Sequence, residues 1–488
     1  MRKLWGNSFI VNPSPPKKQN NNSSKIVQDK GWAWAALLAS FLGCFVAGGI
    51  CFSMGVYYSE YLLLFNPVQV ALLTSTPGSL ILLLGMVSQF LSNQIGYMPT
   101  LIIGSLISAI GFCLSYLSLN IYILIVTQGL LVGTGAGIIF TAAISVNRIY
   151  FNRKYLLANA LAMSGTALGC LCFPILITKL ITNYGIRGSL LINGGIFLNV
   201  CISGCLLFRL PRLSQPLETK DNKTDVNHPI KVASPRKNDI IDAESAQAIN
   251  ATHDTDNHVK EMRVRNWKSV TFLISCALWQ MGSNIIYFMI ADFGRNLHFN
   301  VLQSSALISW IGIGDIMGRM TITLWGVFES SRRKKIVTTD LYAIKTFKSI
   351  SFFNKILVFL ASIIVHLIIC VAYLYPTFKY SYYPFLSFMF GVFFGIRITL
   401  TPNMVDHMFG SKFFRAYGIT MMMCGIGGII GSPLASWVSS KFHNPYIMFY
   451  MMAIMFFLSA LFFMASFMTK LKQLYRMTHT TPEKLLIR

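Results

Sequence analysis

Two residues of opposite charge, Asp315 and Arg319, lie within a run of sequence that is otherwise apolar. Residues four apart share one face of a helix, so these side chains can meet. A charge in the middle of a membrane costs about 2.5–3.5 kcal/mol on insertion scales, and it therefore faces a cavity or a partner. Arginine can bind a carboxylate through two hydrogen bonds. The pair is therefore a candidate binding and switching site, in which Arg319 holds the carboxylate of a substrate and Asp315 releases it or binds a proton. A static ion pair is the alternative.

Arg397 is the second cation inside an apolar run. Two interpretations stay open for it. It contacts a bound substrate as a second anion-binding group, or it is a structural partner, for instance of Asp315. His366 stands alone in its run, and we interpret it as structural.

The composition indicates that lipid surrounds these residues. Hydrophobic residues make up 54% of the 488-residue chain and charged residues 12%, against about 25% charged in soluble proteins, and the mean hydropathy is +0.56. The net charge of +24 lies between the apolar runs and not on one soluble face, so we expect no nucleic-acid binding. The ten cysteines lack zinc spacing, and we expect no metal, no cofactor and no enzyme, because no soluble domain could hold an active site.

Twelve apolar runs are about 20 residues or longer, the length that crosses a bilayer as a helix. The predicted fold class is therefore an all-α polytopic membrane protein with twelve transmembrane helices, at 32–58, 68–91, 99–118, 121–147, 155–182, 189–208, 268–291, 302–326, 352–375, 381–405, 413–439 and 445–469. The predicted units are a tail (1–28), a six-helix half (29–208), a polar linker expected to be disordered (209–267), a second six-helix half (268–469) and a tail (470–488).

Positive charges are distributed unevenly between the two ends of these spans. Of the 41 Lys and Arg residues, two lie deep inside spans and five lie in or beside the short gaps after odd-numbered spans. The remaining 34 lie in the termini, the linker and the gaps after even-numbered spans. Lys and Arg are enriched on the cytoplasmic side of membranes. Both termini and the linker are therefore predicted to be cytoplasmic, with the plasma membrane as the expected location.

An internal repeat relates the two halves. Residues 133–169 align without gaps on 391–427, with matches that include Gly133 with Gly391 and Gly137 with Gly395. Both copies cross the membrane in the same direction, so the halves are predicted to be pseudo-symmetric parallel repeats, a plan that resembles the major-facilitator fold.

Arg148 and Asp406 occupy equivalent repeat positions near the cytoplasmic ends of the fourth and tenth spans. Opposite charges at matched positions could form an ion pair between the halves and gate that side. Ordinary interfacial charges are the alternative.

Three stretches resemble the monocarboxylate transporter family within the major facilitator superfamily. The first, at 29–34 (DKGWAW), opens the first span and matches a family signature except for Lys30, where glycine is usual. The second, at 150–165 (YFNRKYLLANALAMSG), runs from the turn after the fourth span into the fifth. The third, at 314–319 (GDIMGR), carries Asp315 and Arg319 at the family's spacing. The likeness covers about residues 30–470.

The resemblance implies a symporter-like carrier of a small organic solute, most simply a monocarboxylate, in which Asp315 and Arg319 take part in binding the substrate and protons. Proton-coupled members carry a lysine late in the first span, and that position falls here on Phe52, beside Ser53, so both are candidate substrate-binding residues. Proton-independent members that move aromatic amino acids, thyroid hormones, creatine or carnitine are therefore alternative models, and a non-transporting receptor or scaffold is a further one. The resemblance also suggests a single-span, immunoglobulin-like accessory glycoprotein as a partner.

Overall fold

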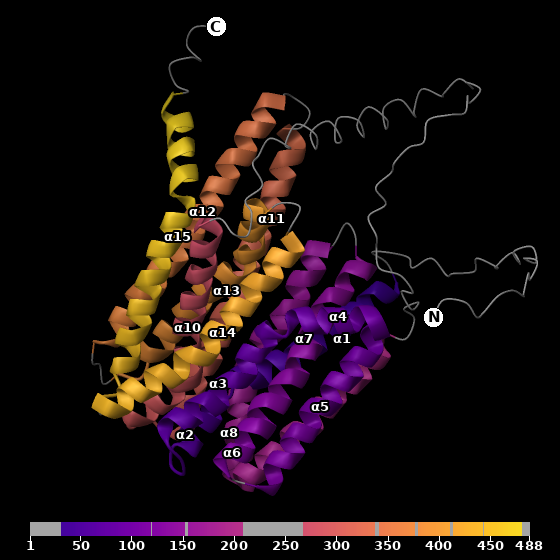
Figure 1. The fold of residues 1–488 in the computed structure, drawn as a ribbon, viewed down its shortest axis with the longest axis vertical. Coiled ribbons are helices and arrows are strands. Elements are labelled where there is room, and N and C mark those ends of the chain that lie inside the picture. Colours follow the sequence, from indigo (N-terminus) through magenta and orange to yellow (C-terminus); the bar gives the residue numbers. More distant parts are fainter. Residues whose placement is uncertain are drawn as a thin grey trace, which may run out of the picture.

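The computed structural model describes residues 31–118, 120–151, 155–207, 267–336, 341–375, 379–409, 413–442 and 444–480. The predicted N-terminal tail, nearly all of the linker and the last eight residues of the C-terminal tail lie outside this part of the chain. Within it the chain is almost entirely helical and contains no strand. Figure 1 shows the two halves side by side, one coloured indigo to magenta and the other rose to yellow.

The first half is built from the following helices: α1 (Trp32–Phe52), α2 (Gly55–Tyr61), α3 (Pro67–Leu83), α4 (Gly85–Ile95), α5 (Tyr97–Leu117), α6 (Ile121–Leu124), the π-helical turn η1 (Ile125–Leu131), α7 (Val132–Tyr150) and α8 (Tyr155–Cys205). The second half contains α10 (Trp267–Asn296), α11 (Val301–Ile336), α12 (Leu341–Tyr373), α13 (Tyr382–Phe409), α14 (Phe413–Phe442) and α15 (Ile447–Thr480).

These helices account for twelve spans among the described residues. Ten helical stretches are long and apolar enough to cross a membrane, and α3 with α4, bent by 54°, make an eleventh. The twelfth comes from α8, whose 51 residues are interrupted at Gly185 with φ 72° and ψ 177°. Only glycine adopts this backbone region readily, so Gly185 is the turn between the predicted fifth and sixth spans. The predicted fold class is confirmed.

Three helices extend beyond the predicted spans. Helix α11 continues to Ile336, α12 begins at Leu341, and α15 continues to Thr480. The membrane-length apolar stretch of α12 is Ser351–Tyr373, and the turns before it contain Lys345 and Lys348. Periodicity of apolar residues identifies the lipid-embedded part of a helix and carries no information about its polar continuation.

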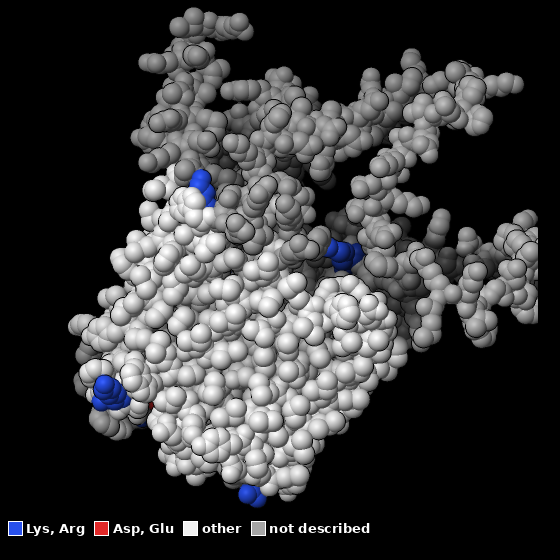
Figure 2. Space-filling model, in the orientation of Figure 1, with Lys and Arg blue, Asp and Glu red and all other residues white. Residues whose placement is uncertain are grey.

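The outer surface of the helix bundle is apolar, as expected of a surface that faces lipid. Large apolar side chains such as Phe90, Leu117 and Ile202 are exposed along it. In the view of Figure 2 the described surface is an almost unbroken uncharged band, and Lys and Arg show only near its margins. Hydrocarbon cannot hydrogen-bond to a peptide group, which is why continuous helices fill this band.

Glycines bring the helices together in the same way in both halves, as the internal repeat predicts. An added methyl at Gly137 would lie 2.9 Å from the carbonyl oxygen of Leu80 on α3, and one at its repeat-mate Gly395 would press on α11 at Asp315. Small residues at helix contacts let backbones approach closely in membranes. The second span therefore packs on the fourth as the eighth packs on the tenth.

This close packing predicts a position-dependent cost for adding one methyl group. In Gly318→Ala the methyl would press on the carbonyl oxygen of Val392 on α13, and overpacking of this kind costs about 1–3 kcal/mol. We expect a lower melting temperature for the purified protein. The control is Gly326→Ala on the same helix, where an added methyl meets nothing within 4 Å and alanine is the better helix former. Equal melting temperatures for the two variants would contradict this packing.

Candidate functional site

Asp315 and Arg319 form the ion pair that their spacing predicts. Arg319 donates from Nε to Asp315 Oδ1 at 2.7 Å and from Nη2 to Oδ2 at 2.9 Å. The side chains are 6% and 3% exposed for Arg319 and Asp315, so water screens the pair little. Among the described residues, Nη1 of Arg319 has no hydrogen-bond partner. The guanidinium fork is therefore occupied by an internal carboxylate, and its third nitrogen, Nη1, keeps its N–H groups unused.

The pair lies at the contact between the two halves. Asp315 sits against Gly395 of α13, where an added methyl would come within 2.7 Å of its Oδ1. Arg319 lies within electrostatic reach of Cys44 on α1, Cys170 on α8 and Tyr287 on α10. Helices α1 and α8 belong to the first half, whereas α11, which carries the pair, belongs to the second. A side chain placed here can contact both halves.

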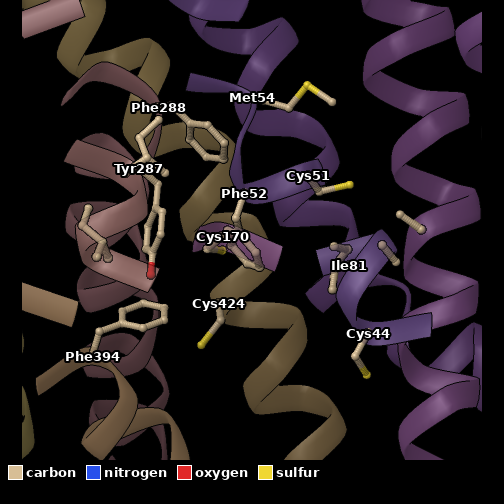
Figure 3. Close-up of a cluster of buried hydrophobic side chains, with 14 of the residues drawn as sticks. Cys44, Cys51, Phe52, Met54, Ile81, Cys170, Tyr287, Phe288, Phe394 and Cys424 are labelled. Carbon is tan, nitrogen blue, oxygen red and sulfur yellow. The ribbon is translucent and has the colours of Figure 1, made fainter. Parts of the chain in front are cut away.

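Phe52 and Ser53 lie beside this contact, at the break between α1 and α2. The Phe52 ring packs on Tyr287 across the halves, with centroids 5.4 Å apart, and Tyr287 in turn meets Phe394 of α13 at 5.2 Å. Figure 3 shows Phe52 and Tyr287 facing each other. The Ser53 hydroxyl donates to the Gly49 carbonyl at 2.6 Å. Phe52 thus lies at the contact between the halves, whereas the Ser53 hydroxyl proton is used by its own helix.

Arg397 occupies a different environment from Arg319. Only 1% of it is exposed, and its guanidinium carbon lies 4.1 Å from the Trp279 ring centroid and 4.6 Å from that of Phe359. Residues two apart on a helix point to nearly opposite sides, so Arg397 faces away from the side on which Gly395 meets Asp315. Among the described residues Asp315 pairs with Arg319 and not with Arg397. The structure therefore does not contain the Asp315–Arg397 pair that was one of the two interpretations of Arg397.

Arg148 and Asp406, the predicted gate, lie at the ends of α7 and α13, and both are exposed. No ion pair joins them within the described part of the chain. Their gating role stays a prediction.

An ion pair between the halves is present at the opposite end of the bundle. Arg295 of α10 donates to the Glu60 carboxylate of α2 and, from Nη1 at 3.4 Å, to the Ser59 carbonyl. The side chains are 22% and 17% exposed for Arg295 and Glu60. Nearby, the hydroxyls of Tyr58 and Ser436 lie 3.2 Å apart. We call Glu60 and Arg295 the α2-end latch.

One further hydrogen bond connects the halves near mid-membrane. Asn284 of α10 donates to the Ser79 hydroxyl of α3 at 3.0 Å and accepts from Gln280 at 2.8 Å. Gly428 of α14 leaves room for this contact, since an added methyl would lie 2.5 Å from the Ser79 hydroxyl. The side-chain hydrogen bonds between halves, as far as the described residues go, thus gather between mid-membrane and the α2 end.

The latch and the aromatic pair were not predicted. One signal was available for Glu60, which is the sole acidic residue between 31 and 207. An isolated acid next to a membrane border needs a partner, and Arg295 is one of the five Lys and Arg residues in or beside the short gaps after odd-numbered spans. Tyr287 carried no signal of its own, because aromatic residues are common throughout these spans.

The family model of the Major Facilitator Superfamily matches residues 36–377, and the chain belongs to this superfamily. It is therefore a multi-pass membrane transporter.

Within the superfamily, similar proteins are named monocarboxylate transporters, which confirms the resemblance seen in the sequence motifs. Monocarboxylate transporter 14 of Mus musculus is 24% identical over 450 residues, 84% of this chain and 85% of that protein. Monocarboxylate transporter 12-B of Danio rerio is 22% identical over 423 residues, 84% of this chain and 82% of that protein. The match to Monocarboxylate transporter 14 of Homo sapiens is 31% identical over 199 residues, but it spans 40% of this chain and 38% of that protein.

Solved structures share the fold. The peptide transporter POT in complex with sulfate superposes with a TM-score of 0.62 at 11% identity, covering 92% of this chain and 98% of that chain. A mutant of the nucleoside transporter NupG gives a TM-score of 0.60 at 13% identity, covering 90% and 100%. Identities this low concern the fold alone.

The latch predicts that its charge pairing, and not either charge alone, closes the α2 end. A partly exposed ion pair contributes about 0.2–1 kcal/mol. We therefore expect Glu60→Gln to speed modification of Ser436→Cys by an impermeant thiol reagent about twofold to fivefold, and the charge swap Glu60→Arg with Arg295→Glu to restore the slower rate.

The matched control is Glu329→Gln. It removes the partner of Lys355, an ion pair of 3.1 Å and similar exposure within the second half, and it should leave the labelling rate unchanged. A charge swap that labels as fast as the single variant would argue against a latch.

Proposed function

We propose that this protein carries a monocarboxylate, or a related carboxylate-bearing metabolite, across the membrane by alternating access, and that it has no enzymatic activity. The observation that carries the proposal is the buried two-point pairing of Arg319 with Asp315 at the contact between halves. In the resting pair the Asp315 carboxylate stands where a solute carboxylate would bind. The site is therefore already shaped for that group.

Exchange of one carboxylate for the other supplies the switching step. The free Nη1 of Arg319 offers a first hydrogen bond to an entering solute, which then displaces Asp315 from the fork. Asp315, released in a poorly solvated place, takes up a proton or turns toward water. Because the pair lies where both halves meet, the exchange changes the contacts that hold the halves in one arrangement.

Phe52 and Tyr287 close this site toward the α2 end. Their ring contact joins α1 to α10, and the latch lies beyond it on α2 and α10. We infer that solute enters this arrangement from the end at which Arg148 and Asp406 are exposed, and that Arg148 and Asp406 pair when the carrier opens the other way.

A second candidate function is favoured by Phe52 itself. An aromatic side chain stands where proton-coupled relatives are expected to carry lysine, and it packs on Tyr287. Such a site suits a proton-independent facilitative carrier of aromatic amino acids or of thyroid hormone-, creatine- or carnitine-like solutes, because a flat or apolar solute body can stack on the rings. A receptor or scaffold without transport is the remaining alternative, and accumulation of solute in vesicles separates it from both carriers.

The proposed setting is the plasma membrane, with both termini cytoplasmic and the positive charges of the chain on that side. A single-span, immunoglobulin-like glycoprotein is proposed as an accessory partner. Co-purification after mild solubilisation tests for it.

Arg319→Lys and Arg319→Ala test the carboxylate anchor. Lysine keeps the charge but loses the fork, and one charge-assisted hydrogen bond contributes about 1.5–3 kcal/mol, so we expect solute affinity to fall about 10–150-fold. Arg319→Ala should abolish uptake while the protein still reaches the cell surface. Radiolabelled uptake across a panel of carboxylates, normalised to surface protein, measures both. Normal uptake by Arg319→Ala would remove Arg319 from the site.

The dependence of uptake on pH distinguishes the two carriers. If Asp315 takes up the proton, acidifying the side from which solute enters should raise the rate of carboxylate uptake, and Asp315→Asn should lose this response. A proton-independent carrier of an aromatic or zwitterionic solute should show the same rate at acidic and neutral pH. A pH response that persists in Asp315→Asn would place the proton elsewhere.

A further inference from the structure

The core of the second half contains a cation that pairs with no carboxylate among the residues the structure describes. Arg397 of α13 lies against the rings of Trp279 on α10 and Phe359 on α12. Its exposed fraction is 1%, and those of Trp279 and Phe359 are 3% and 0%. The acidic residues in the described part of this half are Asp292, Asp315, Glu329 and Asp406, and none forms an ion pair with Arg397.

Several hydrogen-bond donors around this cation are unused. Within the described residues, Nε and Nη1 of Arg397 and the indole Nε1 of Trp279 have no partner. Cys276 lies within electrostatic reach of Arg397, and its carbonyl accepts from the Cys424 thiol at 3.6 Å. Buried N–H groups in proteins are almost always satisfied, and in a lipid-embedded core the bulk solvent cannot supply the acceptor. The site thus has an excess of donors and of positive charge.

The fold itself does not require a cation here. The repeat-mate of Arg397 is Ile139, which is fully buried in the first half among apolar atoms and glycines such as Gly43 and Gly104. The same helix arrangement is therefore stable with an aliphatic side chain at this place. Because one repeat has a buried arginine where the other has isoleucine, we infer that Arg397 has a function that only the second half performs.

We propose that Arg397, together with the indole N–H of Trp279, binds a small monovalent anion of the halide class inside the second half. The ion neutralises the guanidinium and accepts the hydrogen bonds that the protein leaves unmade. A small ion is favoured over an organic carboxylate because Trp279 and Phe359 are at most 3% exposed, so a larger group would have to displace these rings. The site is separate from the Arg319 fork, so the anion is a bound partner of the carrier and not its solute.

Halide-dependent stability of the whole protein tests the proposal. An ion that binds only the folded state raises its melting temperature in a saturable way. For purified protein in lipid nanodiscs, we expect chloride or bromide to raise the melting temperature relative to methanesulfonate at equal ionic strength. Arg397→Gln should remove this response. Lys441→Gln, which changes an exposed cation resting on the Trp437 ring, should keep it.

A second variant and a structure cover the case in which Arg397→Gln fails to fold. Trp279→Phe keeps a ring beside the guanidinium but removes the N–H group, and it should weaken the apparent halide affinity about tenfold. A structure determined in bromide should show the ion at Arg397. The proposal is overturned if the wild-type protein is equally stable in both media, if Trp279→Phe keeps the full response, or if ordered water bridges Arg397 and the unpartnered Nε2 of His366 in place of a halide.

Discussion

Hydrocarbon solvates neither a charge nor an unpaired peptide group, and this constraint organises the whole molecule. It forces the backbone into continuous helices, and it requires each buried charge to find a partner. Asp315 and Arg319 meet that requirement with each other, through two hydrogen bonds of 2.7 and 2.9 Å. Because the pair lies where the halves touch, the partner that satisfies Arg319 also influences how the halves are held. A solute carboxylate can replace Asp315 without leaving a charge unpaired.

The glycines make this arrangement possible. Gly391 and Gly395 of α13 have no side chain between α13 and α11, and the Asp315 carboxylate occupies the space at Gly395. Across the halves, Gly312 of α11 lies against the backbone of α8 at Cys170, and Gly425 of α14 lies against α3 at Leu83. At these glycines the contacts are between backbones and small residues, so the halves can separate and meet again there without rebuilding large interlocked side chains.

Much of this could be predicted from the sequence, because lipid leaves a strong local signal. Span length and apolar runs gave the twelve spans, the repeat gave the two halves, and the four-residue spacing gave the Asp315–Arg319 pair. Contacts between helices that are far apart in the sequence could not be predicted. The Glu60–Arg295 latch joins residues 235 positions apart, and the placement of Arg397 between Trp279 and Phe359 depends on which way one helix face turns. Neither leaves a periodic pattern.

The most direct test of the account is whether the place beside Arg319 can be reached from both sides of the membrane. Cys170 of α8 lies within electrostatic reach of Arg319 and is 2% exposed in the present arrangement. In a protein that retains Cys170 as its last cysteine, impermeant thiol reagents should modify it from either side of sealed vesicles during turnover, and a transported carboxylate at saturation should slow the reaction. A Cys170 that stays unmodified from both sides would contradict alternating access at this pair.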